Sequence, residues 1–214
     1  MSRTQYYQQL KERARQVRDE FGLATLKVGR SQLRKVFKEY QITFDLWPPK
    51  STSSPAKFKK LRGAFFYDEC GPTIMVNRYL PDEPAIFTMA HEFKHYLFDK
   101  ELGKVLCTEN NQNEEIEIGA EIFAAELILP DQDFVKCMAE MEIPRGGCTP
   151  ETLVRLKKQY QSTLSYAGLV KKATFLDFAL YETFKGVRWR QLEEKLFGEP
   201  PYKKFHRSRK KYGK

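Results

Sequence analysis

Two histidines stand four residues apart in the stretch His91-Glu92-Phe93-Lys94-His95. Side chains four residues apart on a helix lie on the same face, so both imidazoles can bind one metal ion. Glu92, beside them, is placed to take a proton from an attacking water, the arrangement of H-E-x-x-H hydrolases. The alternative is a surface helix with two incidental histidines. Because the whole chain has only three histidines, chance is a weak explanation for this spacing.

A catalytic zinc site needs a third protein ligand, and the helix predicted from about residue 113 to Pro130 offers several glutamates. Glu117 and Glu121 share a face with the small Ala120 and Ala124, which lets this helix approach the histidine helix closely. We predict Glu117 as the third ligand. We predict that Glu121, one turn on, accepts a hydrogen bond from the other ring nitrogen of a ligand histidine. The alternative, glutamates that only solvate a helix face, is acceptable for Glu114, Glu115 and Glu126.

Hydrophobic periodicity and turn residues predict the elements that must position these side chains. The predicted helices cover residues 2–21, 31–40 with Ser31 as N-cap, the histidine stretch from residue 82 or 83, and two or three segments between 149 and 197. The predicted strands cover 42–46, 61–67 and 73–77, the last two forming a hairpin. Residues 50–60 and 101–113 are predicted to be polar connections.

These elements predict an α+β fold that is mostly helical, with a small antiparallel sheet packed against the histidine helix and a C-terminal helical subdomain. We place a metal-binding domain at residues 1–148, a helical subdomain at 149–202 and a basic flexible tail at 203–214. His206, in this tail, is expected to be a surface histidine.

The net charge of +9 is unevenly distributed along the chain. Residues 63–142, which hold the histidines, carry 17 acidic and 5 basic side chains, whereas residues 203–214 carry 7 basic and no acidic ones. The acidic middle would favour cationic segments of a substrate. With 41% hydrophobic and 14% aromatic residues, the composition excludes a disordered chain.

The four cysteines are widely spaced and form no C-x-x-C pair, which argues against a zinc ribbon or a redox dithiol and favours reduced thiols. No apolar run approaches the roughly 18 residues that a membrane-spanning helix needs, and the N-terminus lacks the apolar stretch of a signal peptide. We therefore expect a cytoplasmic protein with no membrane partner.

Two stretches of the sequence resemble the ImmA/IrrE family of metallo-endopeptidases. Residues 87–97, FTMAHEFKHYL, are similar to the family pattern F-T-x-A-H-E-x-G-H-x-L, and residues 117–130, EIGAEIFAAELILP, to E-x-x-A-N-x-F-A-A-x-L-L-M-P. The resemblance covers about residues 20–130. It implies a thermolysin-like core, His91, His95 and Glu117 as zinc ligands, and Glu92 as general base. Manganese or iron could also occupy such a site.

Two positions depart from the family pattern. Lys94 stands where Gly is usual within H-E-x-x-H, and Glu121 stands where Asn is common. Neither change removes a ligand. We expect Lys94 to add positive charge near the mouth of the site if its helix face allows, and Glu121 to change the surroundings of the ligands.

The resemblance implies a zinc endopeptidase that cuts a helix-turn-helix repressor and so relieves repression of a stress regulon or a mobile element. The sequence does not identify the donor that would stabilise the oxyanion; Tyr79 and Tyr96 are nearby, but a tyrosine here is more often a core residue. A second hypothesis is a non-catalytic anti-repressor with a structural or vestigial metal. Retention of Glu92, which a structural site does not need, argues against it.

A third hypothesis is direct DNA binding. Residues 149–180 could form a helix-turn-helix, with Ser162 or Thr163 near a helix start and basic residues at both ends. The alternative, a packed helical subdomain with solvated lysines, is favoured because basic runs are commonly just exposed faces.

Overall fold

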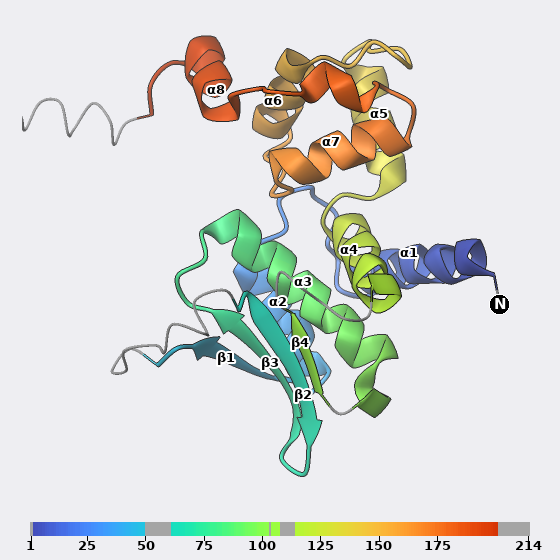
Figure 1. The fold of residues 1–214 in the computed structure, drawn as a ribbon, viewed down its shortest axis with the longest axis vertical. Helices are drawn as coiled ribbons and strands as arrows, with labels where there is room; N and C mark the ends of the chain where they lie inside the picture. The colour runs from blue at the N-terminus through green and yellow to red at the C-terminus, as the bar shows by residue number, and fades with distance from the viewer. Residues whose placement is uncertain (1, 50–60, 103, 108–113, 201–214) are drawn as a thin grey trace, which may run out of the picture. The chain divides into compact units, whose positions relative to one another are not determined.

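The computed structural model describes residues 2–49, 61–102, 104–107 and 114–200 (Figure 1). The predicted connection at residues 50–60, the basic tail and His206 therefore lie outside the described residues. Contacts divide the chain into two compact units, one of Met1–Phe134 with Tyr160–Ser165 and one of Val135–Gln159 with Tyr166–Lys214. The predicted domain boundaries after residues 148 and 202 stay predictions. Among the described residues, no helix has the length and apolar character to cross a membrane.

The first unit is built on a four-stranded sheet with the order β1-β3-β2-β4 (Figure 1). Its strands are β1 (Thr43–Trp47), β2 (Gly63–Asp68), β3 (Gly71–Asn77) and β4 (Lys104–Cys107). The predicted β2–β3 hairpin is confirmed, as is the α+β class. The sheet is mixed rather than wholly antiparallel, because β1 pairs with β3 in parallel. Strand β4 lies in a segment predicted as a connection: it is only four residues long and gains its hydrogen bonds from antiparallel pairing with β2.

Helix α3 (Asp82–Phe98) carries the H-E-x-x-H motif and packs against β2 and β3. It follows Pro81 as N-cap, and two acidic residues in its first turn, Asp82 and Glu83, suit the positive end of the helix dipole. The helix is buried along nearly its whole length, from Ala85 to His95 with the exception of Phe87. Because one side of α3 lies on the sheet, its motif side chains are held in fixed directions.

Phe93, between the two motif histidines, fixes the rotation of α3 about its axis. Its ring is fully buried and lies 5.6 Å from the Phe37 ring of α2 (Arg30–Glu39) and 6.1 Å from the Phe123 ring of α4 (Glu114–Ile128). It also stacks on Tyr96 at an interplanar angle of 9°. These aromatic contacts place Phe93 in the core, so the histidines on either side of it must face elsewhere.

The start of α2 differs from its prediction. The N-cap is Gly29, and Ser31 lies inside the helix. The side chain of Gln32 accepts a hydrogen bond of 2.8 Å from the Gly29 N–H. The glutamine thus caps the N-terminus of α2, and no serine cap is needed.

Helix α1 (Arg3–Glu20) packs on α4, which in turn packs on α3 (Figure 1). Gly119 of α4 lets α1 approach closely, because a Cβ built on it would make tight contacts of 3.1 Å with both the Leu10 Cδ1 and the Tyr6 Oη. Leu10 and Val17 of α1 are fully buried. Helix α4 is therefore held on two sides, which fixes the position of its glutamates.

A buried charge network joins α1 to the corner between α4 and α5 (Asp131–Glu140). Glu126 is fully buried, accepts a hydrogen bond of 3.0 Å from Arg15, and accepts another of 3.0 Å from the Asp131 N–H at the start of α5. Lys11 pairs with Asp131 at 2.6 Å. The interpretation of Glu126 as a solvating residue is therefore wrong: α1 covers it, and that contact lies more than 100 residues away in sequence.

We expect Glu126→Ala to lower the free energy of unfolding by about 1–3 kcal/mol, since it removes the acceptor of the Arg15 Nη1 group and of the Asp131 N–H. Urea titration followed by circular dichroism measures this. The matched control is Glu12→Ala, because Glu12 pairs with the same arginine at 2.8 Å but is exposed; little or no change is expected. Equal effects of the two substitutions would contradict the role assigned to the buried carboxylate.

The second unit is helical, as predicted for residues 149–197. It contains α6 (Pro150–Gln159), α7 (Tyr166–Phe175), the short 3-10 helix η3 (Tyr181–Phe184) and α8 (Trp189–Phe197). Two lysines of the suspected helix-turn-helix, Lys157 and Lys172, are buried, and Lys157 lies over the Tyr166 ring at 5.3 Å. This arrangement is that of a packed helical subdomain, and direct DNA binding stays a prediction.

The cysteines with described side chains are free thiols, in agreement with the reduced state predicted. Cys70 is exposed, whereas Cys137 and Cys148 are buried. Burial raises the pKa of the Cys148 thiol to about 12, so this thiol stays protonated and inert near neutral pH.

Candidate metal centre

Three side chains from two helices meet at one point. His91 and His95 come from α3, one turn apart, and Glu117 comes from the first turns of α4. Nε2 of His91 lies 3.0 Å from Glu117 Oε2, and Nε2 of His95 lies 3.7 Å from Glu117 Oε1. One ligand atom from each of the three residues lies within 4.8 Å of the others. The structure thus brings together the three residues that the sequence predicts as ligands.

These distances suit a zinc ion. Bonds of about 2.0–2.2 Å to nitrogen and oxygen in a tetrahedral site separate the ligand atoms by about 3.3–3.6 Å. The 3.0 Å separation from Glu117 Oε2 and the 3.7 Å separation from Glu117 Oε1 lie on either side of that range, and one ligand atom of each residue lies within 4.8 Å of the others. Two imidazoles and one carboxylate are also a donor set that zinc uses in catalysis. The residues present therefore fit the ion.

The charge around His91 is dominated by acidic groups. Burial disfavours its charged form, but the hydrogen bond with Glu117 and the negative charges of Glu92, Glu117 and Glu121 outweigh burial and raise the pKa of His91 above its ordinary value. A dication placed between these groups would replace the proton on His91 and meet the same negative charge.

His95 is oriented by Asp99, one turn further along α3. Its Nδ1 lies 2.6 Å from Asp99 Oδ2; because the carboxylate only accepts, Nδ1 carries the proton and Nε2 presents its lone pair towards Glu117. Burial lowers the pKa of His95, helped by the positive charges of His91 and Lys94, so its ring is neutral as metal binding requires. Burial would raise the pKa of Asp99, but hydrogen bonds from His95 and Lys94 reverse this and lower it.

Glu92 is fully buried between α3 and the sheet. Its carboxylate lies against Gly63 of β2: a Cβ built on that glycine would be 2.5 Å from Glu92 Oε1 and 2.4 Å from Thr88 Cγ2. A side chain at position 63 would therefore occupy space that the glutamate uses. The negative charge of Glu92 contributes to the raised pKa of His91.

Residues 53–146 match the family model Peptidase_M78, the IrrE N-terminal-like domain. This stretch contains β2, β3, α3 and α4, and with them Glu92 and all three clustered residues. The chain carries an IrrE N-terminal-like domain. The family resemblance predicted from the two motif stretches is therefore confirmed, and the domain is of a metallopeptidase family. No curated protein matches the chain.

Lys94, which departs from the family pattern, does not lie at the mouth of the site. It is fully buried, and its Nζ donates to Asp99 Oδ2 at 2.7 Å and to the Ile116 carbonyl at 3.2 Å. The expected positive charge near the mouth of the site depended on the helix face of Lys94, and burial of that face rules it out. The side chain points between α3 and α4 rather than to solvent, because Asp99 offers it a buried carboxylate.

Glu121 is exposed rather than embedded in the helix interface. It contributes negative charge to His91, but the Nδ1 of His95 is held by Asp99. Its predicted hydrogen bond to a ligand histidine stays a prediction. Sequence reasoning missed Asp99, although a visible signal existed: an aspartate four residues after His95 lies on the same helix face.

Neither tyrosine considered as an oxyanion donor has a position that favours this role. Tyr79 is 71% exposed, and the half-buried Tyr96 directs its hydroxyl to the Tyr40 carbonyl at 3.5 Å, within the aromatic core. The interpretation of Tyr96 as a core residue fits these contacts. The donor stays unassigned among the described residues.

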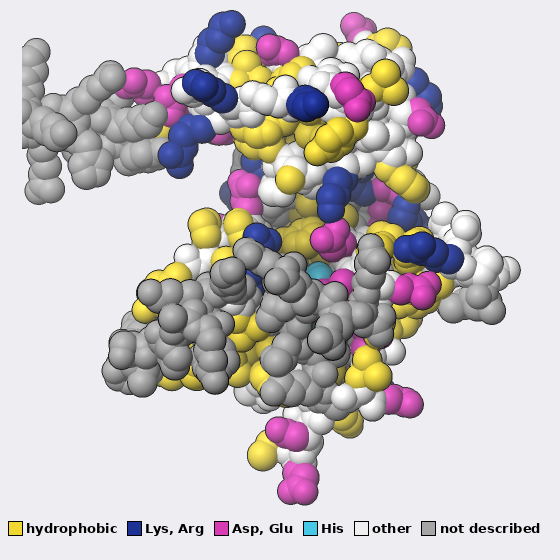
Figure 2. Space-filling model, viewed as in Figure 1, with side chains coloured by type: hydrophobic (Ala, Val, Ile, Leu, Met, Phe, Trp, Pro, Cys, Tyr) yellow, Lys and Arg dark blue, Asp and Glu magenta, His cyan; other side chains and the backbone are white. Residues whose placement is uncertain are grey.

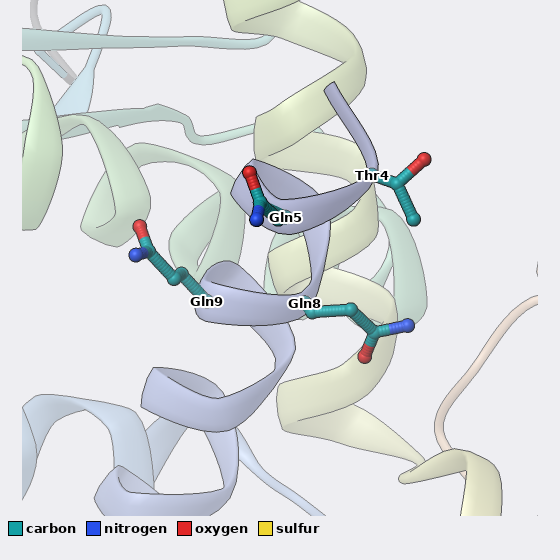
Figure 3. Close-up of a pocket in the computed structure, with 4 residues that line it drawn as sticks. All are labelled: Thr4, Gln5, Gln8 and Gln9. Carbon is teal, nitrogen blue, oxygen red and sulfur yellow. The ribbon is translucent and has the colours of Figure 1, made fainter. Parts of the chain in front are cut away.

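The centre reaches the surface at His91 and Glu117, whose side chains are 11% and 18% exposed, whereas His95 is fully buried. Figure 2 shows a small cyan histidine area beside magenta acidic side chains. A separate hollow on α1 is bordered by uncharged polar side chains, with Gln5 and Gln9 pointing to one side of the helix and Thr4 and Gln8 to another (Figure 3). Its described lining offers no titratable group for chemistry.

Proposed function

We propose that this protein is a zinc-dependent endopeptidase and that Glu92 is its general base. The observation that carries the proposal is the meeting of His91, His95 and Glu117 within 4.8 Å on two helices that are packed together, with a buried glutamate next to the first histidine. A purely structural site would have no use for that glutamate.

The residues divide the work of peptide hydrolysis. The two imidazoles and the Glu117 carboxylate would hold the ion, and Asp99 keeps the Nε2 of His95 turned towards it. When bound, zinc would polarise the scissile carbonyl and lower the pKa of a water molecule towards about 7. Glu92 would accept a proton from the attacking water and deliver it to the leaving amine, first as base and then as acid.

For the substrate we propose a helix-turn-helix transcriptional repressor in the cytoplasm, cut at one place so that repression ends. Two considerations support this class. The resemblance of the two motif stretches to the ImmA/IrrE family implies such repressors as substrates. Residues 63–142, with 17 acidic against 5 basic side chains, would favour the cationic segments that a DNA-binding protein presents.

The test is cleavage of a purified helix-turn-helix repressor, chosen as the one encoded next to this protein. We expect the zinc-loaded protein to give two fragments that mass spectrometry assigns to a single cut. Intact repressor after prolonged incubation with zinc-loaded protein would contradict the proposed substrate. If the same protein also failed to cut unfolded polypeptides, the proposed peptidase activity would be contradicted.

Removal of the metal should abolish cleavage without unfolding the domain. The ligand helices are held by the sheet, by α1 and by the aromatic contacts of Phe93, none of which needs an ion. We therefore expect EDTA treatment to stop cleavage while the helical content, measured by circular dichroism, stays the same. One equivalent of zinc should restore activity, and manganese and iron are tested in parallel. Full activity of protein shown to be metal-free by elemental analysis would contradict a metal-dependent mechanism.

A further inference from the structure

Lys94 contacts both parts of the candidate metal centre, the part around His95 and the part around Glu117. Its ammonium donates to Asp99 Oδ2 at 2.7 Å, the same oxygen that lies 2.6 Å from His95 Nδ1. It also donates to the carbonyl of Ile116 at 3.2 Å, the residue directly before Glu117. One buried cation therefore contacts both the acceptor that orients His95 and the backbone that carries Glu117.

The surroundings of this ammonium are specific rather than incidental. Lys94 is fully buried, which costs free energy unless each donor has a partner. An ammonium has three donors, and besides Asp99 and the Ile116 carbonyl the face of the Tyr6 ring lies 5.8 Å away, within the range of a cation–π contact. Three different elements, α1, α3 and α4, therefore converge on one side chain.

We propose that Lys94 is a positioning residue for the metal centre: it holds the Asp99 carboxylate, and through it the His95 ring, while fixing the α4 backbone beside Glu117. This inference rests on the proposed zinc function but concerns a residue that takes no part in ligation. Two donors on one carboxylate oxygen leave Asp99 a single orientation. The family pattern that the motif resembles usually has Gly at this position. A glycine has no side chain to donate these hydrogen bonds.

The test compares zinc affinity and the absorption spectrum of the cobalt-substituted protein in wild type and Lys94→Met. Methionine keeps much of the volume but removes the charge and all three donors. We expect zinc affinity, measured by competition with a chelating dye, to fall about 10-fold, the smaller effect typical of groups that orient ligands. The visible cobalt band, which reports ligand geometry, should shift or lose intensity.

Lys11→Met is the matched control. Lys11 is also a buried lysine paired with an aspartate, Asp131 at 2.6 Å, but it lies at the corner of α1 and α5. It should lower stability while leaving zinc affinity and the cobalt spectrum unchanged. Adding Lys94→Met to Asp99→Asn should lower zinc affinity by less than Lys94→Met does alone, because only the contact with the Ile116 carbonyl is then left to lose.

A folded Lys94→Met protein with wild-type or tighter zinc affinity and an unchanged cobalt spectrum would overturn the inference. If Lys94→Met does not fold, the isosteric Asp99→Asn decides, since an unaltered centre in that variant would contradict the proposal that Lys94 positions His95 through the Asp99 carboxylate. Failure of the proposed function is distinguishable: wild-type protein that binds zinc and responds to Lys94→Met, but cuts no polypeptide, would refute the peptidase and keep the positioning role.

Discussion

Glu92→Gln is expected to abolish measurable peptide cleavage, lowering kcat by about 10²–10⁴-fold, while zinc content and fold stay as in the wild type. Glutamine has the shape of glutamate and fits the same buried space against β2. Its amide cannot accept the proton of an attacking water or return it to the leaving amine. The loss should therefore appear in kcat, with substrate binding little changed.

The measurement combines fragment production from the repressor, elemental analysis for zinc and circular dichroism. Glu115→Gln is the control, because Glu115 is an exposed glutamate of α4 whose loss changes the net charge equally. Cleavage by Glu92→Gln at the wild-type rate would remove Glu92 as the base. If instead cleavage stops but the variant still relieves repression in cells, the protein acts as a non-catalytic anti-repressor.

The parts of the centre that sequence could predict are those set by one helix. His91, Glu92 and His95 share α3, and the 3.6-residue period alone places both imidazoles on one face. Glu117 required one further step, the assumption that a helix with small residues packs on α3. Ala120 and Ala124 are fully buried, and α4 does pack on α3.

The errors come from contacts between elements distant in sequence. Glu126 looked like a solvating residue because nothing local shows that α1 covers it and supplies Arg15. Lys94 looked like a surface charge because its two acceptors come from the end of α3 and from α4. Strand β4 owes its conformation to pairing with β2 rather than to its own four residues. In each case tertiary contacts override the local pattern.

Gly63 lies beside the proposed general base Glu92, and no motif marks it. It is the first residue of β2 and pairs with Val76 of β3 and Cys107 of β4, and a glycine in a paired strand position contributes no side chain to packing. The close approach of α3 accounts for the glycine: a Cβ at this position would lie 2.4 Å from Thr88 Cγ2 and 2.5 Å from Glu92 Oε1. The strand therefore carries no side chain where the helix presents its base.

We expect Gly63→Ala to lower kcat by about 10²-fold, since displacing a catalytic group by roughly 1 Å has an effect of this size. Thr88 is buried and β-branched, so it cannot easily turn away, and the Glu92 carboxylate must move instead. Zinc affinity should stay close to that of the wild type, because neither clash touches a ligand atom. The measurement is kcat together with zinc affinity and thermal stability.

Two further variants separate displacement of Glu92 from a general loss of stability. Gly29→Ala is the control, because a Cβ there meets nothing nearer than 3.6 Å, and kcat should not change. In Gly63→Ala/Thr88→Ser the methyl group of Thr88 is gone, which opens space on one side of the new Cβ and should restore part of kcat. If the second substitution restores stability but no activity, the glycine serves packing alone; recovery of kcat would show that β2 is shaped around the catalytic glutamate.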